Sequence, residues 1–436
     1  MTKTQANPAH TEGPKGRRVV ITGYGAVTCV GNNANETWDS MRTAKSGIAT
    51  IDPAVLEGFK DTWTSRIGGQ VKDLDVAAYM EHREAKRLDR CTVLGVGAAA
   101  EAVAHAGIDF EAEDRSRCGV VIGSGVGGIA TIEQTAHTLK ARGPDRISPF
   151  TVPRLMANAT AGNVSIRFGL KGPCSAHATA CASSGHAIGD AVNYIRRGHA
   201  DIMVTGGTEA AVTPLCLGAF MTMKALSTRN DDPARASRPF DKDRDGFLLA
   251  EGAGILVIES LEHALARGAT IHAELVGYGN SADAYHITAP DEGGGGASRS
   301  MEWALADAGL DPTDIDYINA HGTSTPLGDA AEVTAVLGVF GDHARKSTGG
   351  KLLMSSTKGV HGHALGASGG VESIACIHAV RDGLIAPTAN LDNPDDEFDI
   401  DLVANDAREQ PVRYAMNNTF GFGGHNVTLI LARYEG

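Results

Sequence analysis

One cysteine and two histidines, each beside glycine or other small residues, could together carry out acyl chemistry. Cys181 lies in the run TACASSG, His321 in NAHGT and His363 in KGVHGH. A thiol is a nucleophile, and histidine is the side chain most often used to transfer protons near neutral pH. Cys181 could also be an inert buried cysteine, the usual role of a single cysteine and the one expected of the other six.

The segment after Cys181 predicts a helix that begins close to the thiol. Apolar residues recur there at helical spacing, at Ile188, Ala191, Val192 and Ile195. An unperturbed thiol has a pKa of about 8.5 and is mostly protonated at neutral pH. Because backbone N–H groups and the helix dipole favour an anion at a helix N-terminus, we expect them to raise the thiolate fraction of Cys181.

Short β-rich runs alternate with helical patterns along the chain, which predicts mixed α/β layers. Two successive series resemble a duplicated unit joined near residue 268. The first half, 17–268, contains Cys181, and the second, 269–436, contains both histidines. The predicted strands are 19–22, 119–122, 202–205, 255–258, 272–277, 315–319, 352–356 and 427–433. The predicted helices are 35–45, 88–107, 129–142, the one after Cys181, one ending near 267, 297–308, 329–338 and 366–381.

Composition excludes several classes of function. The chain of 436 residues carries a net charge of −13, which disfavours nucleic acid as a general partner. No apolar run approaches the roughly 20 residues that span a bilayer, so no membrane insertion is expected. Residues 1–16 are polar and lack the apolar core of a secretory signal, and we interpret them as a flexible tail. Seven scattered cysteines without a CxxC pair favour a reducing compartment, hence a cytoplasmic protein.

Four basic residues form a local exception to this acidic composition. Arg83, Lys86, Arg87 and Arg90 are spaced by three, one and three residues, which predicts one shared helix face. The simpler interpretation of such a run is a solvated face. On an acidic protein the same face could instead bind an acidic partner.

Two patterns imitate cofactor sites. Residues 123–128 match G-x-G-x-x-G after a strand, but the acidic residue at the spacing of a dinucleotide site, Asp145, does not close a second strand. A tight turn is therefore favoured there. Residues 241–246 imitate the start of a calcium loop, but the twelfth position is Gly252 where a bidentate Glu is needed.

The histidines allow two chemistries. His321, His361 and His363, with Glu372, could bind zinc. The alternative is acid–base and oxyanion work on a substrate carbonyl. The loop after His321 is rich in hydroxyls and glycine, which favours close approach of a substrate over a rigid ligand shell.

Together these residues and their flanking motifs resemble the β-ketoacyl-acyl-carrier-protein synthases of the thiolase superfamily. The resemblance runs from about Arg17 to Tyr434 and is nearest to the type II elongating enzymes of bacterial fatty-acid synthesis. It implies a duplicated, thiolase-like α-β-α-β-α arrangement of layers. The motifs that carry it are TACAS at 179–183, ALSTRND at 225–231, RPFDKDRDGF at 238–247, NAHGTSTP at 319–326, Lys358 with His363, and NTFGFGG at 418–424.

The resemblance implies a decarboxylative Claisen condensation without a metal or redox cofactor. Cys181 would take the acyl chain as a thioester. His321 and His363 would stabilise the enolate that is left when CO2 departs from malonyl-acyl carrier protein, and the product would be a longer 3-oxoacyl chain. The backbone N–H groups of Cys181 and Phe422 would hold the oxyanion, and Phe422 would also gate the acyl pocket.

The same resemblance implies supporting roles. Lys358 and Glu372 would form a charged pair that orients the histidine site. Thr323 and Thr325 would hydrogen-bond the phosphopantetheine arm of acyl carrier protein. That acidic carrier would be the partner of a homodimeric enzyme. The residues expected to meet the carrier are Arg83, Lys86, Arg87 and Lys224.

Some features depart from the family pattern, and other relatives remain as alternatives. His361 lies where relatives usually have Thr, so it could perturb the site or face away, and residues around 346–351 predict a longer surface loop. A type II polyketide ketosynthase would use the same chemistry on another pathway. A non-catalytic partner subunit is disfavoured by the intact Cys181 and histidines. A CoA-dependent thiolase is disfavoured because such relatives have a second cysteine where this chain has His363.

Overall fold

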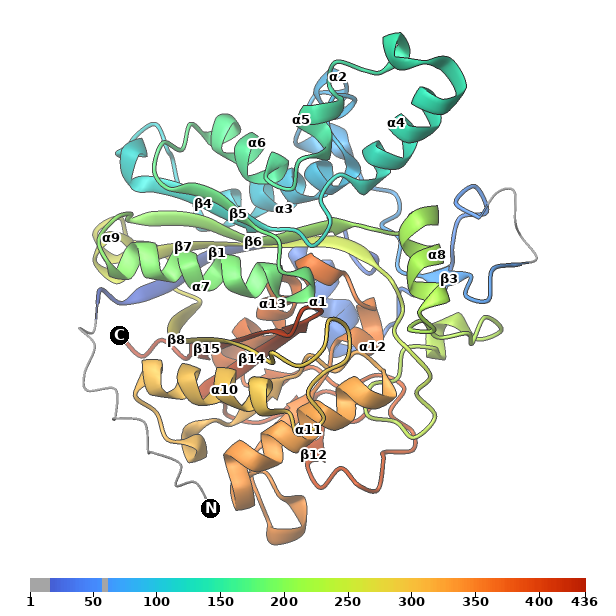
Figure 1. Ribbon diagram of the computed structural model, residues 1–436. Helices are drawn as coiled ribbons and strands as arrows, with labels where there is room; N and C mark the ends of the chain where they lie inside the picture. The colour runs from blue at the N-terminus through green and yellow to red at the C-terminus, as the bar shows by residue number, and fades with distance from the viewer. Residues whose placement is uncertain (1–15, 57–61) are drawn as a thin grey trace.

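One continuous sheet of eleven strands forms the centre of the fold, and its two halves, called here the first and the second sheet, have the same order of strands (Figure 1). The computed structural model describes residues 16–56 and 62–436, so the predicted tail at 1–16 lies, apart from Gly16, outside the described residues. The first sheet has the order β1 (Val19–Thr28), β7 (Glu251–Ser260), β6 (Ile202–Ala210), β4 (Cys118–Gly123) and β5 (Cys174–His177). The second has the order β8 (Ala273–Ala282), β15 (His425–Ala432), β14 (Tyr414–Gly421), β9 (Tyr317–Asn319) and β10 (Leu353–Ser355), with β12 (Asp401–Leu402) beside β10.

The strand order confirms the predicted duplication. Numbered along the chain, the five main strands of each sheet are arranged 1-5-4-2-3. The sheets join where β1 pairs with β8, at only two positions, Val20 with Glu274 and Ile21 with Ala273. The chain therefore folds twice into the same pattern, although the two halves show no obvious residue-level repeat.

Helices make three further layers around these sheets (Figure 1). Helices α7 (Ser183–Arg196) and α13 (Ser368–Asp382) lie between the two sheets, where α7 packs on β6 and α13 packs on both β7 and β14. The outer face of the first sheet is covered by α3 (Arg90–Ala106) and α6 (Ala159–Phe168). The outer face of the second is covered by α10 (Gly295–Ala308), against which α11 (Pro326–Phe340) packs. The predicted α-β-α-β-α layering is confirmed.

Shorter elements surround these layers. α1 (Ala34–Arg42) begins at Asn33, whose side chain accepts a hydrogen bond from the backbone N–H of Glu36. It packs on β1 and α13. The remaining elements are β2 (Ala49–Thr50), β3 (Ile67–Gly68), α2 (His82–Ala85), α4 (Ile129–Arg142), α5 (Thr151–Leu155), α8 (Pro214–Thr222), α9 (Leu261–Ala266), α12 (Lys358–His361), β11 (Leu384–Ile385) and β13 (Arg408–Glu409).

Tertiary contacts decide the elements that the sequence pattern does not predict. The strand β5 has the sequence CSAH, which carries no strand signal, but its backbone pairs with β4. The prediction of one continuous basic helix face is wrong, because α2 ends at Ala85 and α3 begins only at Arg90. Arg90 is moreover paired with Glu251, 2.6 Å away.

Within residues 16–56 and 62–436, no helix combines the length and the apolar character needed to cross a membrane.

Glycines allow the central helices to approach the strands closely. A Cβ on Gly254 of β7 would lie 2.2 Å from the backbone N of Val371 in α13. A Cβ on Gly370 of the same helix would lie 2.2 Å from the backbone O of Gly254. Real Cβ atoms do not approach backbone atoms so closely, so α13 can occupy this place only without side chains at these two positions.

We therefore expect opposite effects from two glycine-to-alanine changes within helices. Gly370→Ala should destabilise the protein by about 1–3 kcal/mol or more, because backbone must move to admit the methyl group. Gly338→Ala in α11 should stabilise it by about 0.5–1 kcal/mol, because Gly338 is exposed and its Cβ would meet nothing within 4 Å. Urea unfolding of both variants measures the difference. Equal stabilisation by both would contradict the close approach of α13 to β7.

Candidate active site

Cys181 lies at the start of α7, as predicted. It is the middle residue of a short 3-10 helix, Ala180–Ala182, that leads directly into α7. Ala180 has a φ of 49°, which is unusual for a residue with a side chain. The second half repeats this geometry, since Leu365, with a φ of 43°, begins the 3-10 helix that leads into α13. The two turns pack against each other at the meeting point of the halves.

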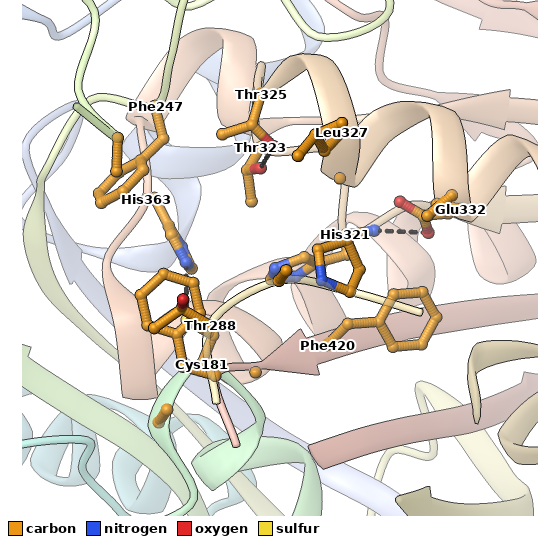
Figure 2. Close-up of a pocket in the computed structure, with 18 of the residues that line it drawn as sticks. Cys181, Phe247, Thr288, His321, Thr323, Thr325, Leu327, Glu332, His363 and Phe420 are labelled. Carbon is orange, nitrogen blue, oxygen red and sulfur yellow. Dashed lines mark hydrogen bonds between the residues drawn. The ribbon is translucent and has the colours of Figure 1, made fainter. Parts of the chain in front are cut away.

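Both predicted histidines face Cys181 from the second half (Figure 2). His363 follows α12, and its Nε2 atom is 2.9 Å from the Cys181 Sγ atom. His321 follows β9, and its ring meets the His363 ring edge-on with 5.3 Å between centroids. The sulfur and one nitrogen of each ring all lie within 4.8 Å of one another. The structure thus brings together three side chains that are far apart in the sequence.

The backbone N–H groups of Cys181 itself and of Phe422 lie near enough to the Cys181 sulfur to favour its thiolate form. Phe422 lies in the turn between β14 and β15 and is followed by Gly423 and Gly424, both with positive φ. A carbonyl carbon bonded to the sulfur would place its oxygen near the same donors. This is the geometry of an oxyanion hole.

Burial controls the protonation of the thiol. Cys181 is 7% exposed, and burial raises its pKa to about 12, although Lys358 and the two N–H groups act in the opposite direction. The backbone N–H groups thus favour the thiolate, as expected, but the loss of water outweighs them, so the thiol stays protonated near neutral pH. The thiol needs a proton acceptor to become a nucleophile, and His363 Nε2 lies at hydrogen-bonding distance.

Both histidines are uncharged near neutral pH. Burial, followed by the charge of Lys358, lowers the pKa of His321 and of His363 well below the usual value for histidine. A neutral imidazole has one nitrogen that accepts and one that donates a proton. The Nδ1 atom of His363 lies 3.0 Å from the Ser368 hydroxyl oxygen, so its Nε2 atom remains directed at the sulfur.

Lys358 supplies the positive charge of the site from a fully buried position. Its ammonium group pairs with Glu372 of α13, and neither side chain is more than 1% exposed. Burial raises the pKa of Glu372, and the neighbouring Lys358 acts against that rise. The pair fixes a cation near the two imidazoles and bridges α12 and α13.

Glu332 is a site residue for which the sequence gives no motif. From α11 its carboxylate accepts hydrogen bonds from the backbone N–H groups of His321, at 2.9 Å, and Gly322, at 2.8 Å (Figure 2). It also accepts one from the Asn418 side chain at 3.2 Å. Burial raises the pKa of Glu332 to about 7. A carboxylate inside a predicted helix carries no signal that it will hold a loop several residues away.

A cavity of about 630 Å³ opens onto these side chains. Thr323 and Thr325 line it, with their hydroxyl oxygens 3.0 Å apart on the side opposite Cys181 (Figure 2). Phe422 and Lys224 also line the cavity. Three of the four predicted docking residues lie elsewhere, exposed on or just after α2, namely Arg83, Lys86 and Arg87.

The zinc set considered from the sequence does not assemble as such. His361 does not line the cavity, and its Nε2 atom lies 3.0 Å from the Thr357 hydroxyl. Glu372 is bound to Lys358. Cys181, His321 and His363 form a different donor set that is close enough to share a metal ion. The charge of Lys358 opposes a second cation at this place.

The two patterns that imitate cofactor sites are occupied by the protein's own side chains. Glu209 of β6 accepts hydrogen bonds from the backbone N–H groups of Gly125 and Val126, so a carboxylate fills the place where a diphosphate would bind. Asp241 accepts hydrogen bonds from the Arg238 side chain and from the backbone N–H of Asp243. Its loop is thus closed by internal hydrogen bonds.

Comparisons with known proteins agree with this geometry. The models "Beta-ketoacyl synthase, N-terminal domain" and "Beta-ketoacyl synthase, C-terminal domain" match residues 16–264 and 272–392. The chain is 46% identical to the 3-oxoacyl-acyl-carrier-protein synthase 2 of Synechocystis sp. and to that of Staphylococcus aureus, in each case over 96% of this chain and 99% of the relative.

Solved structures give the same result. A β-ketoacyl synthase from Burkholderia phymatum is 36% identical, with a TM-score of 0.88, over 96% of this chain and all of that chain. A ketosynthase solved with its type II polyketide acyl carrier protein is 32% identical, with a TM-score of 0.87 and the same coverage. Its nearly full-length similarity to these proteins, its fold and its Cys-His-His site show that the chain belongs to the β-ketoacyl synthase family of acyltransferases.

Proposed function

We propose that this enzyme condenses acyl-acyl carrier protein with malonyl-acyl carrier protein in fatty-acid elongation, releasing CO2 and 3-oxoacyl-acyl carrier protein. The observation that carries the proposal is the position of Cys181, which faces His321 and His363 and has the backbone N–H groups of Cys181 and Phe422 near its sulfur. The 46% identity to 3-oxoacyl-acyl-carrier-protein synthases 2 supports the fatty-acid pathway.

In the first half-reaction the acyl chain moves to Cys181. The sulfur attacks the thioester carbonyl as its proton passes to His363 Nε2, 2.9 Å away. The carbonyl oxygen takes the negative charge and is held by the N–H groups of Cys181 and Phe422. The carbon–sulfur bond to the carrier's arm then breaks, and His363 returns the proton to the leaving thiolate.

In the second half-reaction His321 and His363 donate hydrogen bonds to the thioester oxygen of the malonyl group. The carbon–carbon bond to the carboxylate breaks, CO2 leaves, and the electron pair remains as an enolate. This carbon attacks the acyl carbonyl on Cys181, whose thiolate leaves and takes a proton from water. The Ser368 hydroxyl at His363 Nδ1 is able to accept or to donate a hydrogen bond, so it suits either protonation pattern of the ring.

The cavity suits the phosphopantetheine arm. Thr323 and Thr325 line it opposite Cys181 and would hydrogen-bond the amides of the arm. Phe422 lies among Gly421, Gly423 and Gly424, and the freedom of these glycines supports its role as a gate to the acyl pocket. Lys358 and Glu372 would orient and charge the site without touching substrate.

Acyl carrier protein is the partner that the surface supports. Arg83, Lys86 and Arg87 are exposed cations on an otherwise acidic protein, and Lys224 lies at the cavity itself. Such cations would speed the encounter with an acidic carrier. A related ketosynthase is known in complex with its acyl carrier protein.

A homodimer is supported by the free edge of the first sheet. β5 ends that sheet, with β4 as its one neighbour among the described strands. Ile166 of α6, which packs on β5, is 82% exposed, and Val152 of α5, which packs on α6, is 62% exposed, and a second copy would cover both. We place the boundary between the two halves at residue 268, between the family matches that end at 264 and begin at 272.

The seven cysteines are free, in keeping with a cytoplasmic location.

A type II polyketide ketosynthase is the second candidate. The ketosynthase of the carrier complex is 32% identical to this chain and has the same fold. Because its chemistry is the same, the two candidates differ only in the chains that the acyl pocket accepts. A test with saturated and polyketide acyl carriers separates them.

Replacing the nucleophile tests the proposed function. Cys181→Ala should lose acylation and condensation by on the order of 10³-fold or more, because no other group can form the thioester. Cys181→Gln, which resembles an acylated cysteine, should still release CO2 from malonyl-acyl carrier protein. Mass spectrometry of the acyl-enzyme and a CO2 assay measure the two effects. Condensation by the alanine variant would refute the assignment.

The pH dependence of acylation tests the role of Lys358. Protonation of His363 removes its proton-accepting nitrogen, so acylation falls as the pH drops through the His363 pKa. Because that pKa lies well below the usual 6.5, the rate should hold below the pH at which an ordinary histidine titrates. Lys358→Met removes a charge that lowers the pKa, and the acid limb should therefore move to higher pH. The acylation rate of both proteins is measured across pH. If the folded variant loses activity at the same acid pH as the unchanged enzyme, this electrostatic role is excluded.

Charge reversal tests carrier docking. The triple change Arg83→Glu, Lys86→Glu and Arg87→Glu should lower kcat/KM for acyl-acyl carrier protein about 10-fold or more, and more so at low salt, because encounter is slowed. The rate with acyl-pantetheine should be unaffected. Lys351→Glu, an exposed cation just before β10, serves as the control. Equal losses with the carrier and with free pantetheine would point to a folding defect and against docking.

A further inference from the structure

A fully buried carboxylate joins the two halves of the protein beneath the acyl site. Glu209 lies near the end of β6 and is 0% exposed. One oxygen, Oε2, accepts from the backbone N–H of Gly125 at 2.6 Å and from that of Gly366 at 3.1 Å. The other, Oε1, accepts from the Ser124 hydroxyl at 3.0 Å and from the N–H of Val126 at 3.3 Å.

These partners form one wall of the cavity beside Cys181. Gly125, Val126 and Leu365 line the cavity, and Leu365 belongs to the apolar cluster that contains Cys181. Val126 comes from the first half and Leu365 from the second. An acyl chain on Cys181 prefers such an apolar wall. Glu209 thus holds the wall from below, outside the residues that a substrate would touch.

The glycines around Glu209 leave space for its carboxylate and for little else. A Cβ on Gly366 would lie 2.3 Å from the backbone N of Gly125 and 2.9 Å from Glu209 Oε2. A Cβ on Gly125 would lie 2.8 Å from the same oxygen. The loop at 123–128 and the turn at 365–367 therefore meet around this group, and their separation depends on the hydrogen bonds that it accepts.

We propose that Glu209 is a positioning residue that sets the acyl-chain preference of the enzyme, through its hold on the loop at 123–128 and the turn at Gly366. The proposal rests on the proposed function, because it concerns the acyl chain that Cys181 carries. Glu209 itself forms no bond with substrate.

The chemistry of the carboxylate adds a dependence on pH. As an anion, Glu209 accepts from all four donors, and such charge-assisted hydrogen bonds are roughly twice as strong as neutral ones. A proton on the carboxyl group has to lie on Oε1, because the Ser124 hydroxyl is the one partner that is also able to accept. In the neutral form, Oε2 therefore still accepts from the N–H groups of Gly125 and Gly366, but these hydrogen bonds are weaker because the acceptor is uncharged. Burial raises the pKa of Glu209 to about 7, so both forms are present near neutral pH.

The titratable groups that face Glu209 do not change charge in the same range. Its charge acts on the thiols of Cys181, of Cys91 in α3 and of Cys216 in α8. Burial raises the pKa of each to about 11 or above, so they stay protonated. Glu332 on the other side of the cavity also has a pKa of about 7, but it holds the backbone at His321 and Gly322 and not the wall at 123–128 and Gly366.

Glu209→Gln is the decisive variant because it removes the negative charge and the titration with almost no change in shape. Its NH2 group would donate to Ser124 and could no longer accept from the N–H of Val126, and its oxygen would accept from Gly125 and Gly366. A looser wall should admit longer chains. We expect the ratio of kcat/KM for long over short saturated acyl-pantetheines to rise about three- to tenfold in this variant. Glu101→Gln, which removes a half-buried carboxylate that accepts two backbone N–H bonds and does not line the cavity, is the control.

The pH profile separates this role from a merely structural one. The same ratio in the unchanged enzyme should rise from pH 8 to pH 6, about one unit either side of the Glu209 pKa. In Glu209→Gln the ratio should be constant with pH and at least as high as the low-pH value of the unchanged enzyme. The proposal is overturned if the unchanged enzyme has the same ratio at both pH values. It is also overturned if the folded glutamine variant has the ratio of the unchanged enzyme at pH 8, or if its ratio still depends on pH. Absence of acylation in the unchanged enzyme would instead refute the proposed function.

Discussion

The close backbone approach of α13 to β7 is the constraint on which the rest of the molecule depends. Gly254 and Gly370 remove the side chains that would keep the helix from the strand. At the same seam, a Cβ on Gly207 would lie 2.3 Å from the backbone O of Gly366. Because the start of α13 is fixed in this way, His363 and the turn that follows it arrive beside the equivalent turn of α7. Without that approach, Cys181 and His363 would not be in contact.

Burial at this seam determines the chemistry of the groups that meet there. It keeps Cys181 a thiol and both histidines neutral, since water no longer stabilises their charged forms. The remaining charge is supplied by Lys358, which Glu372 balances. A neutral Cys-His-His set with a nearby cation is suited to move one proton and to stabilise an oxyanion. It is less suited to hold a permanent thiolate.

Several backbone segments of the site are held by buried carboxylates. Glu332 fixes the backbone at His321, and Glu209 fixes the loop at 123–128 together with Gly366. Each carboxylate accepts at least two backbone N–H groups, which cannot turn away to find other partners. The segments that approach the substrate can therefore be rich in glycine and small residues and still have a defined position.

The sequence by itself determined the alternation of strands and helices, the helix after Cys181, and the candidate set of Cys181, His321 and His363. Local patterns suffice for these because apolar periodicity and motif spacing are short-range signals. It could not determine the roles of Glu209 and Glu332, because nothing local says which loop a buried carboxylate will hold. Nor could it determine the thiol's protonation, since burial is a property of the packed protein. The basic helix face failed for the same reason: the turn between α2 and α3, and the pairing of Arg90 with Glu251, arise only when β7 packs on α3.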